Sequence, residues 1–160
     1  MIRISKLADY AVVIMGWLAQ QQAPCSIEQI SEATGVPLAT VRKLTRFLAQ
    51  AKLCSARKGP HGGYRLAHAP QQISLLAVIE AVEGETAVTD CARQEGCDCA
   101  LLPHCDARPG WQVINRIIRS LLSGLSVADV IHENISEPAV LERLTQTAGS
   151  GGQPVGLAPA

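Results

Sequence analysis

The sequence predicts a mainly α-helical fold with a small β wing, in which a winged helix-turn-helix precedes a long helix. Three observations support this prediction. A short helix, a glycine turn and a second, basic helix are expected between residues 26 and 50. A glycine-rich basic loop joins two short strands directly after them. Apolar residues at helical spacing then fill residues 111–125.

The first helix is expected from about Lys6 to Gln20, with Ser5 as its cap. One stripe of it is apolar and should be buried, and it consists of Leu7, Tyr10, Ala11, Ile14, Met15 and Leu18. The segment Ser26-Ile-Glu-Gln29 predicts a capping box, in which Ser26 bonds forward and Gln29 reaches back. A short helix should follow to about Ala33, and Thr34-Gly35 turns the chain.

The next helix is expected from about Pro37 to Gln50, because proline loses little at the first helical position. Its buried face carries Val41, Leu44, Phe47 and Leu48. Its exposed face is polar and basic. Such a face on the second helix of a helix-turn-helix favours the DNA major groove, although any helical hairpin with a solvated side would share the pattern. The candidate DNA contacts here are Pro37, Thr40, Arg42, Lys43 and Arg46.

Two short strands are expected at residues 52–56 and 64–67, joined by the loop Arg57-Lys-Gly-Pro-His-Gly-Gly63. Glycines let the backbone approach phosphates closely, and an arginine at a wing tip can enter the narrow minor groove. Placed directly after the basic helix, this loop predicts a DNA-binding wing. Its candidate contacts are Arg57 in the minor groove, Lys58 on phosphate, and the adjacent His61 and Gly62.

Charge is distributed unevenly, although the formal net charge of the chain is zero. Residues 1–68 contain nine Lys and Arg against three Asp and Glu, a net of +6. Residues 69–160 contain five against eleven, a net of −6. A basic first half indicates a surface for a polyanion, and double-stranded DNA fits best. No apolar run approaches the ~20 residues of a membrane span, so no membrane partner is expected.

Another helix should begin at Ser74 and end before Gly84. Beyond Pro109 comes the longest apolar helix, whose apolar residues are Trp111, Ile114, Ile117, Ile118, Leu121, Leu122 and Leu125. This stripe is too broad for one side of a small domain. We therefore expect the helix to pack both inward and against a second copy in a homodimer.

The end of the chain should contain two short helices and a tail. Ser126 is expected to cap a helix to about Glu133, and Pro138 to open one to about Gln146. Residues 147–160 have almost no apolar bulk and are expected to be disordered. The predicted division is a DNA-binding domain (1–84), a cysteine-rich loop (85–107), a dimerisation helix with C-terminal helices (108–146) and the tail (147–160).

Four of the six cysteines lie between Asp90 and Asp106. They are Cys91, Cys97, Cys99 and Cys105, separated by five, one and five residues. The segment has no helical or alternating apolar pattern, so packing does not explain the thiols. Thiolates gathered on a short loop are the ligands that a soft metal or an iron–sulfur cluster requires.

Other roles for these thiols stay open. Disulfides would need an oxidising compartment, whereas the chain does not start with a basic leader and an apolar stretch, so a reduced, cytoplasmic protein is expected. Structural zinc would favour paired Cys-x-x-Cys knuckles, which this sequence lacks. A thiol switch is a further alternative. Ordinary buried thiols would be scattered, as Cys25 and Cys54 are.

Several motifs together resemble the winged-helix iron–sulfur regulators, the family that includes the iron–sulfur assembly repressor (IscR) and the nitric-oxide-sensitive repressor (NsrR). These motifs are the opening RISKLADYAV, the helix-turn-helix, the wing KGPHGGYRL and a cysteine loop ahead of a long helix. The resemblance covers roughly residues 1–135. The CARQEG and GWQVIN segments are most similar to the branch that regulates the SUF assembly operon.

The resemblance implies a homodimeric bacterial transcription factor with one cluster per subunit. It also implies three cysteine ligands, the last two usually separated by five residues. Cys91, Cys99 and Cys105 match this pattern except that seven residues precede Cys99. Cys91, Cys97 and Cys105 form the alternative trio, and the remaining cysteine is then a spare or the fourth ligand.

The position of the fourth ligand in the assembly repressor is not matched here. In that repressor the fourth ligand is a histidine three residues after the last cysteine. Arg108 stands at that position and cannot ligate. In the nitric-oxide sensor the ligand is an aspartate of the first helix, which Asp9 matches; the alternative is that Asp9 caps a helix or forms a salt bridge. His104 is a third candidate. The cluster type favoured is 2Fe–2S, with 4Fe–4S as the alternative.

The predicted function is a DNA-binding repressor that senses iron–sulfur cluster status, redox change or nitric oxide, and controls cluster assembly genes. A zinc-structured DNA-binding regulator and an iron–sulfur carrier protein are the alternatives. A carrier would not need the basic wing. An enzyme is not expected, because the four histidines, His61, His68, His104 and His132, are dispersed and none lies beside an evident nucleophile.

Overall fold

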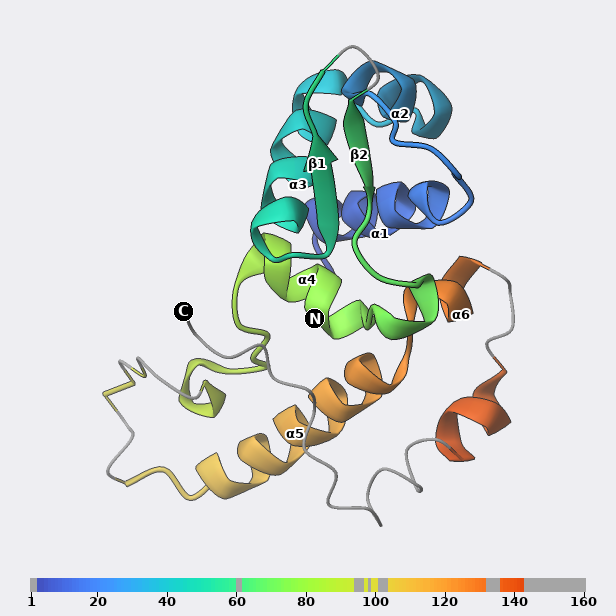
Figure 1. Cartoon of the computed structure of the whole chain (residues 1–160). Coiled ribbons are helices and arrows are strands. Elements are labelled where there is room, and N and C mark those ends of the chain that lie inside the picture. Colours follow the sequence, from blue (N-terminus) through green and yellow to red (C-terminus); the bar gives the residue numbers. More distant parts are fainter. Residues whose placement is uncertain are drawn as a thin grey trace.

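The computed structural model describes residues 3–59, 62–93, 97, 99–100, 104–131 and 136–142. Its elements are, in order, α1 (Lys6–Leu18), α2 (Ile27–Thr34), α3 (Leu38–Gln50), β1 (Cys54–Arg57), β2 (Gly63–Leu66), η1 (Pro70–Gln72), α4 (Leu75–Glu83), η2 (Asp90–Ala92), α5 (Arg108–Gly124) and α6 (Val127–Ile131). Figure 1 shows α1, α2, α3 and the strands at one end of the molecule, α5 at the other end, and α4 between them. The mainly helical fold with a small β wing is confirmed.

Serine caps begin four helices where the sequence predicts them. Each of Ser5, Ser26, Ser74 and Ser126 accepts a hydrogen bond from the backbone N–H three residues further on, at 3.1–3.2 Å. Gln29 completes the predicted capping box by accepting from the Ser26 N–H at 2.8 Å. Gly35 ends α2 in the left-handed conformation, with φ 70°.

Helix α3 begins one residue later than expected. Pro37 is its N-cap, with φ −54° and ψ 137°, so the prediction that Pro37 is the first helical residue is wrong; its extended ψ keeps it outside the helix. The residues buried on α3 are Val41, Leu44, Thr45 and Leu48. Phe47, expected among them, is half-buried. The buried Thr45 hydroxyl donates to the Val41 carbonyl at 2.8 Å, a bond within its own helix.

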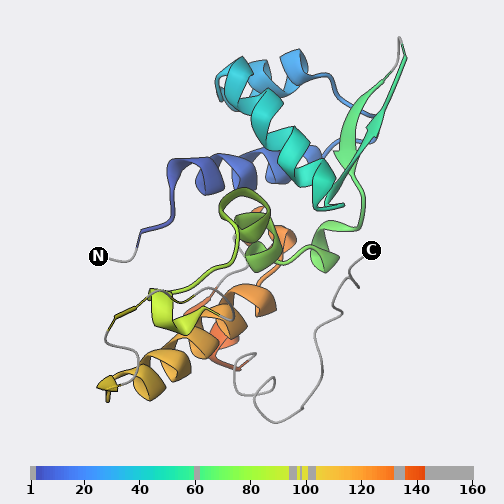
Figure 2. The same ribbon diagram turned by 90° about the vertical axis from the view of Figure 1, so that its left-hand side faces the viewer.

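The wing is a two-stranded antiparallel hairpin, whose register pairs Cys54 with Leu66 and Arg57 with Gly63. Arg57 was expected in the loop, and this is wrong because the pairing with Gly63 extends β1 to Arg57. Tyr64 also exchanges backbone hydrogen bonds with Cys25, at 2.8 and 2.9 Å, which ties β2 to the segment before α2. Figure 2 shows the hairpin projecting from the helical body.

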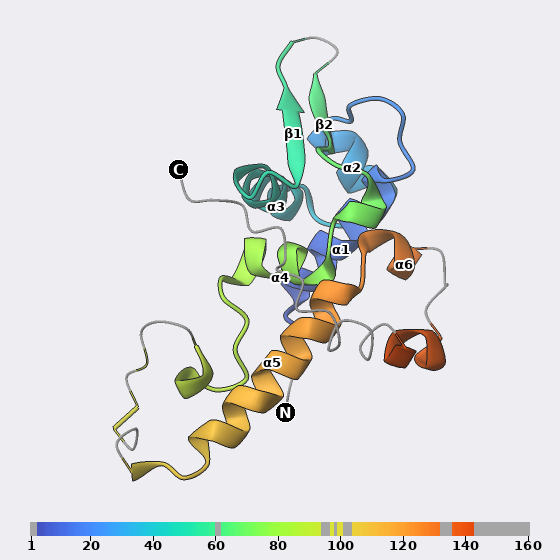
Figure 3. The ribbon, with the colours of Figure 1, turned by 60° about the horizontal axis from the view of Figure 1, so that its bottom comes forward.

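Helix α4 connects the two ends of the molecule, because it packs against α1, α3 and α5. The Leu75 N–H donates to the Leu125 carbonyl and the Val127 N–H to the Ile73 carbonyl, both at 2.8 Å. These bonds fix the end of α5 and the start of α6 beside the start of α4. Figure 3 shows α5 extending from this junction away from the helix-turn-helix.

Helix α5 has two apolar sides, as expected for its broad stripe. On the inner side, Ile118 and Leu122 line a cavity together with Ile79 of α4. On the outer side the exposed apolar residues are Val113, Ile114 and Ile117. Trp111 is also partly exposed, but it lies one turn before Asn115 on the inner side. The inward packing is confirmed by the contact between α4 and α5. Packing against a second copy stays a prediction.

A hydrophobic core cluster lies between α1, α2, α3 and α4, and includes Ile14, Met15, Ile30, Leu44, Leu48 and Val78. Residues 137–142 are helical, and the rest of the last expected helix, the tail 147–160 and His61 lie outside the described residues. In the part of the chain that the structure describes, the helices are too short or too polar to cross a bilayer.

Candidate functional site

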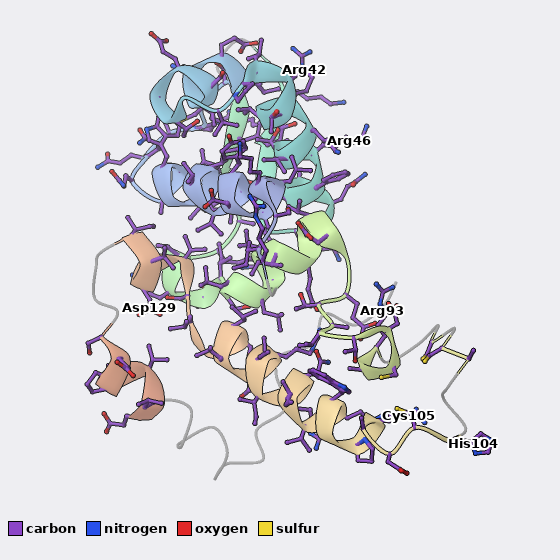
Figure 4. All side chains as sticks on the ribbon, turned by 180° about the vertical axis from the view of Figure 1, so that it is seen from behind. Arg42, Arg46, Arg93, His104, Cys105 and Asp129 are labelled. Atoms are coloured by element: carbon purple, nitrogen blue, oxygen red, sulfur yellow. The ribbon has the colours of Figure 1, made fainter. Side chains whose placement is uncertain are left out.

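The outer face of α3 is basic. Arg42, Lys43 and Arg46 are exposed along it, and Figure 4 shows Arg42 and Arg46 directed away from the protein body. The Lys43 ammonium and the Arg46 guanidinium lie over the Phe47 ring, 5.6 and 5.9 Å from its centroid. The half-buried ring of Phe47 thus holds two cations on one face of the helix. This arrangement suits contacts with DNA bases and phosphates.

The first turn of α3 lies beside this basic face. Pro37 is exposed and Thr40 is half-buried, with the Thr40 N–H donating to the Pro37 carbonyl at 2.8 Å. Leu38 and Ala39 are also exposed in this turn. Sequence reasoning missed both, because an apolar residue at a helix start is expected to be buried. Exposed apolar side chains here could contact thymine methyl groups.

The basic residues of the wing lie near the end of the molecule at which α3 begins. Arg57 at the end of β1 and the following Lys58 are exposed. The half-buried Gly62 donates its N–H to the Gly59 carbonyl at 2.9 Å. In Figures 1 and 2 the outer end of the hairpin and the start of α3 lie at the same end. Arg65, which sequence reasoning missed, is exposed on β2 and donates to the Ser55 hydroxyl at 3.3 Å.

The four loop cysteines differ in burial. Cys91 is buried in η2, and its sulfur lies 3.3 Å from the Thr89 hydroxyl. Cys97, Cys99 and Cys105 are half-buried. All six cysteines of the chain are free thiols in this structure.

The proposed ligands are not assembled into a single site. Among the described residues, no group of three His, Cys, Asp or Glu side chains lies close enough to hold one metal ion. Asp9 is exposed on α1, not buried, and His104 is exposed. Figure 4 shows the His104 ring at the outer edge of the loop, directed away from α5.

The donor set nevertheless fits a soft metal or cluster in its chemistry. Four thiols on one loop are soft ligands. Arg108, three residues beyond Cys105, has a buried Nε–H that finds no hydrogen-bond acceptor among the described residues. Such a donor suits a thiolate or sulfide acceptor, since hydrogen bonds to sulfur stabilise the charged ligands of a cluster.

The two cysteines outside the loop differ from the four within it. Burial raises the pKa of the Cys54 thiol to about 12, and its sulfur packs 3.4 Å from the Met15 sulfur. Burial also raises the pKa of the Cys25 thiol, which donates to the Ala23 carbonyl at 3.3 Å. Both are packed thiols without the features of a ligand, as their scattered positions predict.

The segment before the loop is bound to α5 by polar side chains. Asn115 of α5 contacts the backbone of Val88 and Ala92. Arg119, one turn further, donates to the Thr86 carbonyl at 3.0 Å and pairs with Glu80 of α4. Sequence reasoning missed both residues, because their partners lie 23 to 39 positions away along the chain.

Known proteins similar to this chain are transcriptional regulators. The HTH-type transcriptional regulator IscR of Aliivibrio salmonicida is 31% identical over 135 residues, which cover 83% of this chain and 79% of that protein. The solved structure of CymR, the global cysteine regulator of B. subtilis, matches with a TM-score of 0.64 and 23% identity, over 83% of this chain and 98% of that one. T. potens IscR matches with a TM-score of 0.61 and 24% identity, over 84% of this chain and 89% of that one.

These matches confirm the winged-helix fold and the resemblance to the family that includes IscR. The Rrf2 family model, described as an iron-dependent transcriptional regulator, matches residues 4–133. The prediction that the chain is not an enzyme is confirmed by the same comparisons. The chain therefore belongs to the Rrf2 family of transcriptional regulators.

Proposed function

We propose that this chain is a homodimeric, cytoplasmic repressor whose affinity for its DNA operator depends on an iron–sulfur cluster. One observation leads to this proposal. Four thiols lie on the segment that joins α4 to α5, and one of them, Cys91, is buried where that segment packs against α5. A metal group held there would connect the DNA-binding end of the molecule with the long helix.

The DNA-binding role rests on the exposed cations of α3 and the wing. Arg42, Lys43 and Arg46 would enter the major groove, where a good bidentate contact discriminates between bases by about 1–3 kcal/mol. Arg57 would reach the minor groove and Lys58 a phosphate. Residues 1–84 would form the DNA-binding domain in this assignment.

The cluster role rests on the loop at residues 85–107. Cys91, Cys105 and one or both of Cys97 and Cys99 would be its ligands, with Asp9 of the same or the partner subunit as the candidate fourth. A 2Fe–2S cluster is favoured over 4Fe–4S. When bound, the cluster would supply a crosslink that oxidants, nitric oxide or iron limitation can remove. The regulated genes would then be those for cluster assembly.

The dimer rests on the outer side of α5. Val113, Ile114 and Ile117 are 41–56% exposed in the single chain. Contiguous exposed apolar residues on a long helix mark a surface for a protein partner, and a two-fold axis along α5 would pair this surface with itself. Two recognition helices would then face half-sites about 34 Å apart.

Communication between the cluster and DNA would pass through α4. Helix α4 packs against α1 and α3 on one side and α5 on the other, and the cysteine loop begins just after its end. Closing the loop around a cluster would change how α4 and α5 are held together. The relative pose of the two wings in the dimer would change with it. Regulation follows only if DNA binds one pose better than the other.

The experiment is anaerobic purification of the full chain, followed by iron, sulfide and zinc analysis and by absorption and Mössbauer spectra. An operator is obtained by selecting random DNA duplexes with the anaerobic protein. The proposal predicts iron with sulfide, a visible chromophore, and loss of the chromophore in Cys91→Ala and Cys105→Ala. Cys25→Ala and Cys54→Ala are the controls and should keep it. Stoichiometric zinc without sulfide would support a zinc-structured regulator, and a cluster without any selected DNA would support a carrier.

A further inference from the structure

We propose that Asn115 is a positioning residue for Cys91, one that fixes the segment bearing this thiol to α5. The inference rests on the proposed function in one respect, that Cys91 is a metal ligand. The hydrogen bonds of Asn115 go to the backbone on both sides of the Cys91 thiol, so we infer that it acts through this backbone.

The amide of Asn115 is matched to two backbone groups. Its Oδ1 accepts from the Val88 N–H at 3.1 Å, and its Nδ2 donates to the Ala92 carbonyl at 3.1 Å. Val88 and Ala92 flank Cys91 on either side along the chain. A side chain that both accepts and donates is required, so neither Asp nor Leu could replace both bonds.

Burial makes this contact unusual in the molecule. Among the described residues, Thr45 and Asn115 are the buried side chains with polar character. Thr45 bonds within its own helix, whereas Asn115 reaches a separate segment. Truncating Asn115 would leave the Val88 N–H and the Ala92 carbonyl without their hydrogen-bond partner. A buried polar group without a partner destabilises the folded state far more than an exposed one, which can bond to water.

A neighbouring contact extends the attachment along α5. Arg119, four residues after Asn115 and on the same side of the helix, donates to the Thr86 carbonyl at 3.0 Å and pairs with Glu80. Glu80 also accepts from the Thr86 N–H at 2.9 Å. The segment from Thr86 to Ala92 is thus bonded to two turns of α5. Figures 1 and 3 show η2 beside this helix.

The consequence is that Cys91 differs from the other three loop thiols. It is buried and its segment is bonded to α5, while Cys97, Cys99 and Cys105 are half-buried. A displacement of Cys91 on cluster binding or loss would therefore be passed to α5 through Asn115. Without Asn115, the same displacement would be absorbed by the loop.

The first test uses metal-free, reduced full-length protein and needs no cluster. Cysteine alkylation by iodoacetamide is followed residue by residue in wild type, Asn115→Ala, Asn115→Asp and the control Arg116→Ala, whose side chain is exposed on the same helix. Cys91 should be alkylated about tenfold faster in Asn115→Ala. The Val88 N–H and the Ala92 carbonyl would then be buried without a hydrogen-bond partner, which favours opening of the segment to water. Cys25 and Cys54 report global unfolding and should stay slow in every variant.

Hydrogen exchange at Val88 separates the two halves of the contact. Asn115→Asp keeps an acceptor for the Val88 N–H but loses the donor to Ala92. It should speed Cys91 alkylation while leaving the Val88 N–H protected, whereas Asn115→Ala should speed both. If Asn115→Ala does not fold, the aspartate variant decides the question alone. Unchanged Cys91 alkylation in a folded Asn115 variant would overturn the proposal.

The second test connects the contact to regulation. Each variant is loaded with a cluster anaerobically, and operator affinity is compared with and without the cluster. Asn115→Ala should keep the chromophore and the dimer but lose most of the affinity ratio seen in wild type. An affinity ratio equal to that of wild type would refute the transmission role. If wild type itself holds no cluster, the proposed function fails, while the alkylation result still decides whether Asn115 positions Cys91.

Discussion

Ile117→Glu should convert the proposed dimer into a folded monomer. Ile117 is the most exposed of the apolar residues on the outer side of α5, at 56%. Because its side chain is largely outside the packed interior, and glutamate is a good helix former, the single chain should tolerate the change. Ile118, on the inner side, lines the cavity against α4, so a glutamate there would disturb folding as well as assembly.

The magnitude follows from the area left exposed. Fully burying an isoleucine stabilises by about 1.5–3 kcal/mol, so covering the exposed 56% is worth about 0.8–1.7 kcal/mol per copy. A two-fold interface contains the residue twice, which gives about 1.7–3.4 kcal/mol. That corresponds to a roughly 20- to 300-fold weaker dimer. Desolvating two carboxylates in the interface would weaken it further.

Sedimentation equilibrium and circular dichroism measure the two sides of this prediction. The Ile117→Glu protein should sediment as a monomer, and its circular dichroism spectrum should keep the helical signal of wild type. It should lose operator binding because a monomer can contact only one of the two half-sites. Ser123→Glu, an exposed position on the same helix, is the matched control and should stay dimeric. A dimeric Ile117→Glu protein with undiminished operator affinity would show that the outer side of α5 is not the interface.

Three further predictions concern the wing, the thiols and the backbone. Arg57→Ala should clearly weaken operator binding. Lys58→Ala should reduce the slope of log affinity against log salt concentration by about one unit. If filter-binding titrations show the same affinity and the same slope as wild type, the wing does not contact DNA. Because burial raises the pKa of Cys54 to about 12, its thiolate fraction at pH 8 is about one part in ten thousand. Alkylation at pH 8 should therefore label the half-buried loop thiols first, with Cys54 gaining rate as the pH rises; equal rates at pH 8 would contradict its burial. Gly63→Ala should lower the thermal unfolding midpoint more than Gly35→Ala. A Cβ at Gly63 would lie 2.4 Å from the Cys25 carbonyl oxygen, whereas a Cβ at Gly35 would meet open space. Equal decreases in the midpoint would contradict this backbone arrangement.

The sequence allowed the helices to be placed well because their signals are local. The serine caps and the Ser26–Gln29 box involve residues three apart, and the structure contains them where they were expected. The strand limits were less accurate, since β2 is set by its bridge to Cys25, a partner 39 residues earlier in the chain. The second member of the α6 capping box, Asp129, was also missed: its carboxylate accepts from the Ser126 N–H, as the Gln29 side chain accepts from the Ser26 N–H.

The candidate site was predictable in its residue types and not in its contacts. Basic side chains on α3 and the wing are exposed as their pattern predicts. Asn115 and Arg119 could not be assigned a role, because a polar residue within an apolar stripe gains one only from its tertiary partners. The split of α5 into an inner and an outer side likewise depends on where α4 packs, which hydrophobic periodicity alone does not specify.

The most direct test of the central claim is operator affinity of the cluster-loaded and cluster-free wild-type protein, measured anaerobically at one fixed salt concentration. We expect a ratio of about tenfold or more, equal to a coupling free energy of about 1.4 kcal/mol or more. Both forms should be dimeric and equally folded in this comparison. A ratio within about twofold, under ~0.5 kcal/mol, would mean that any cluster is structural and that the chain does not sense it.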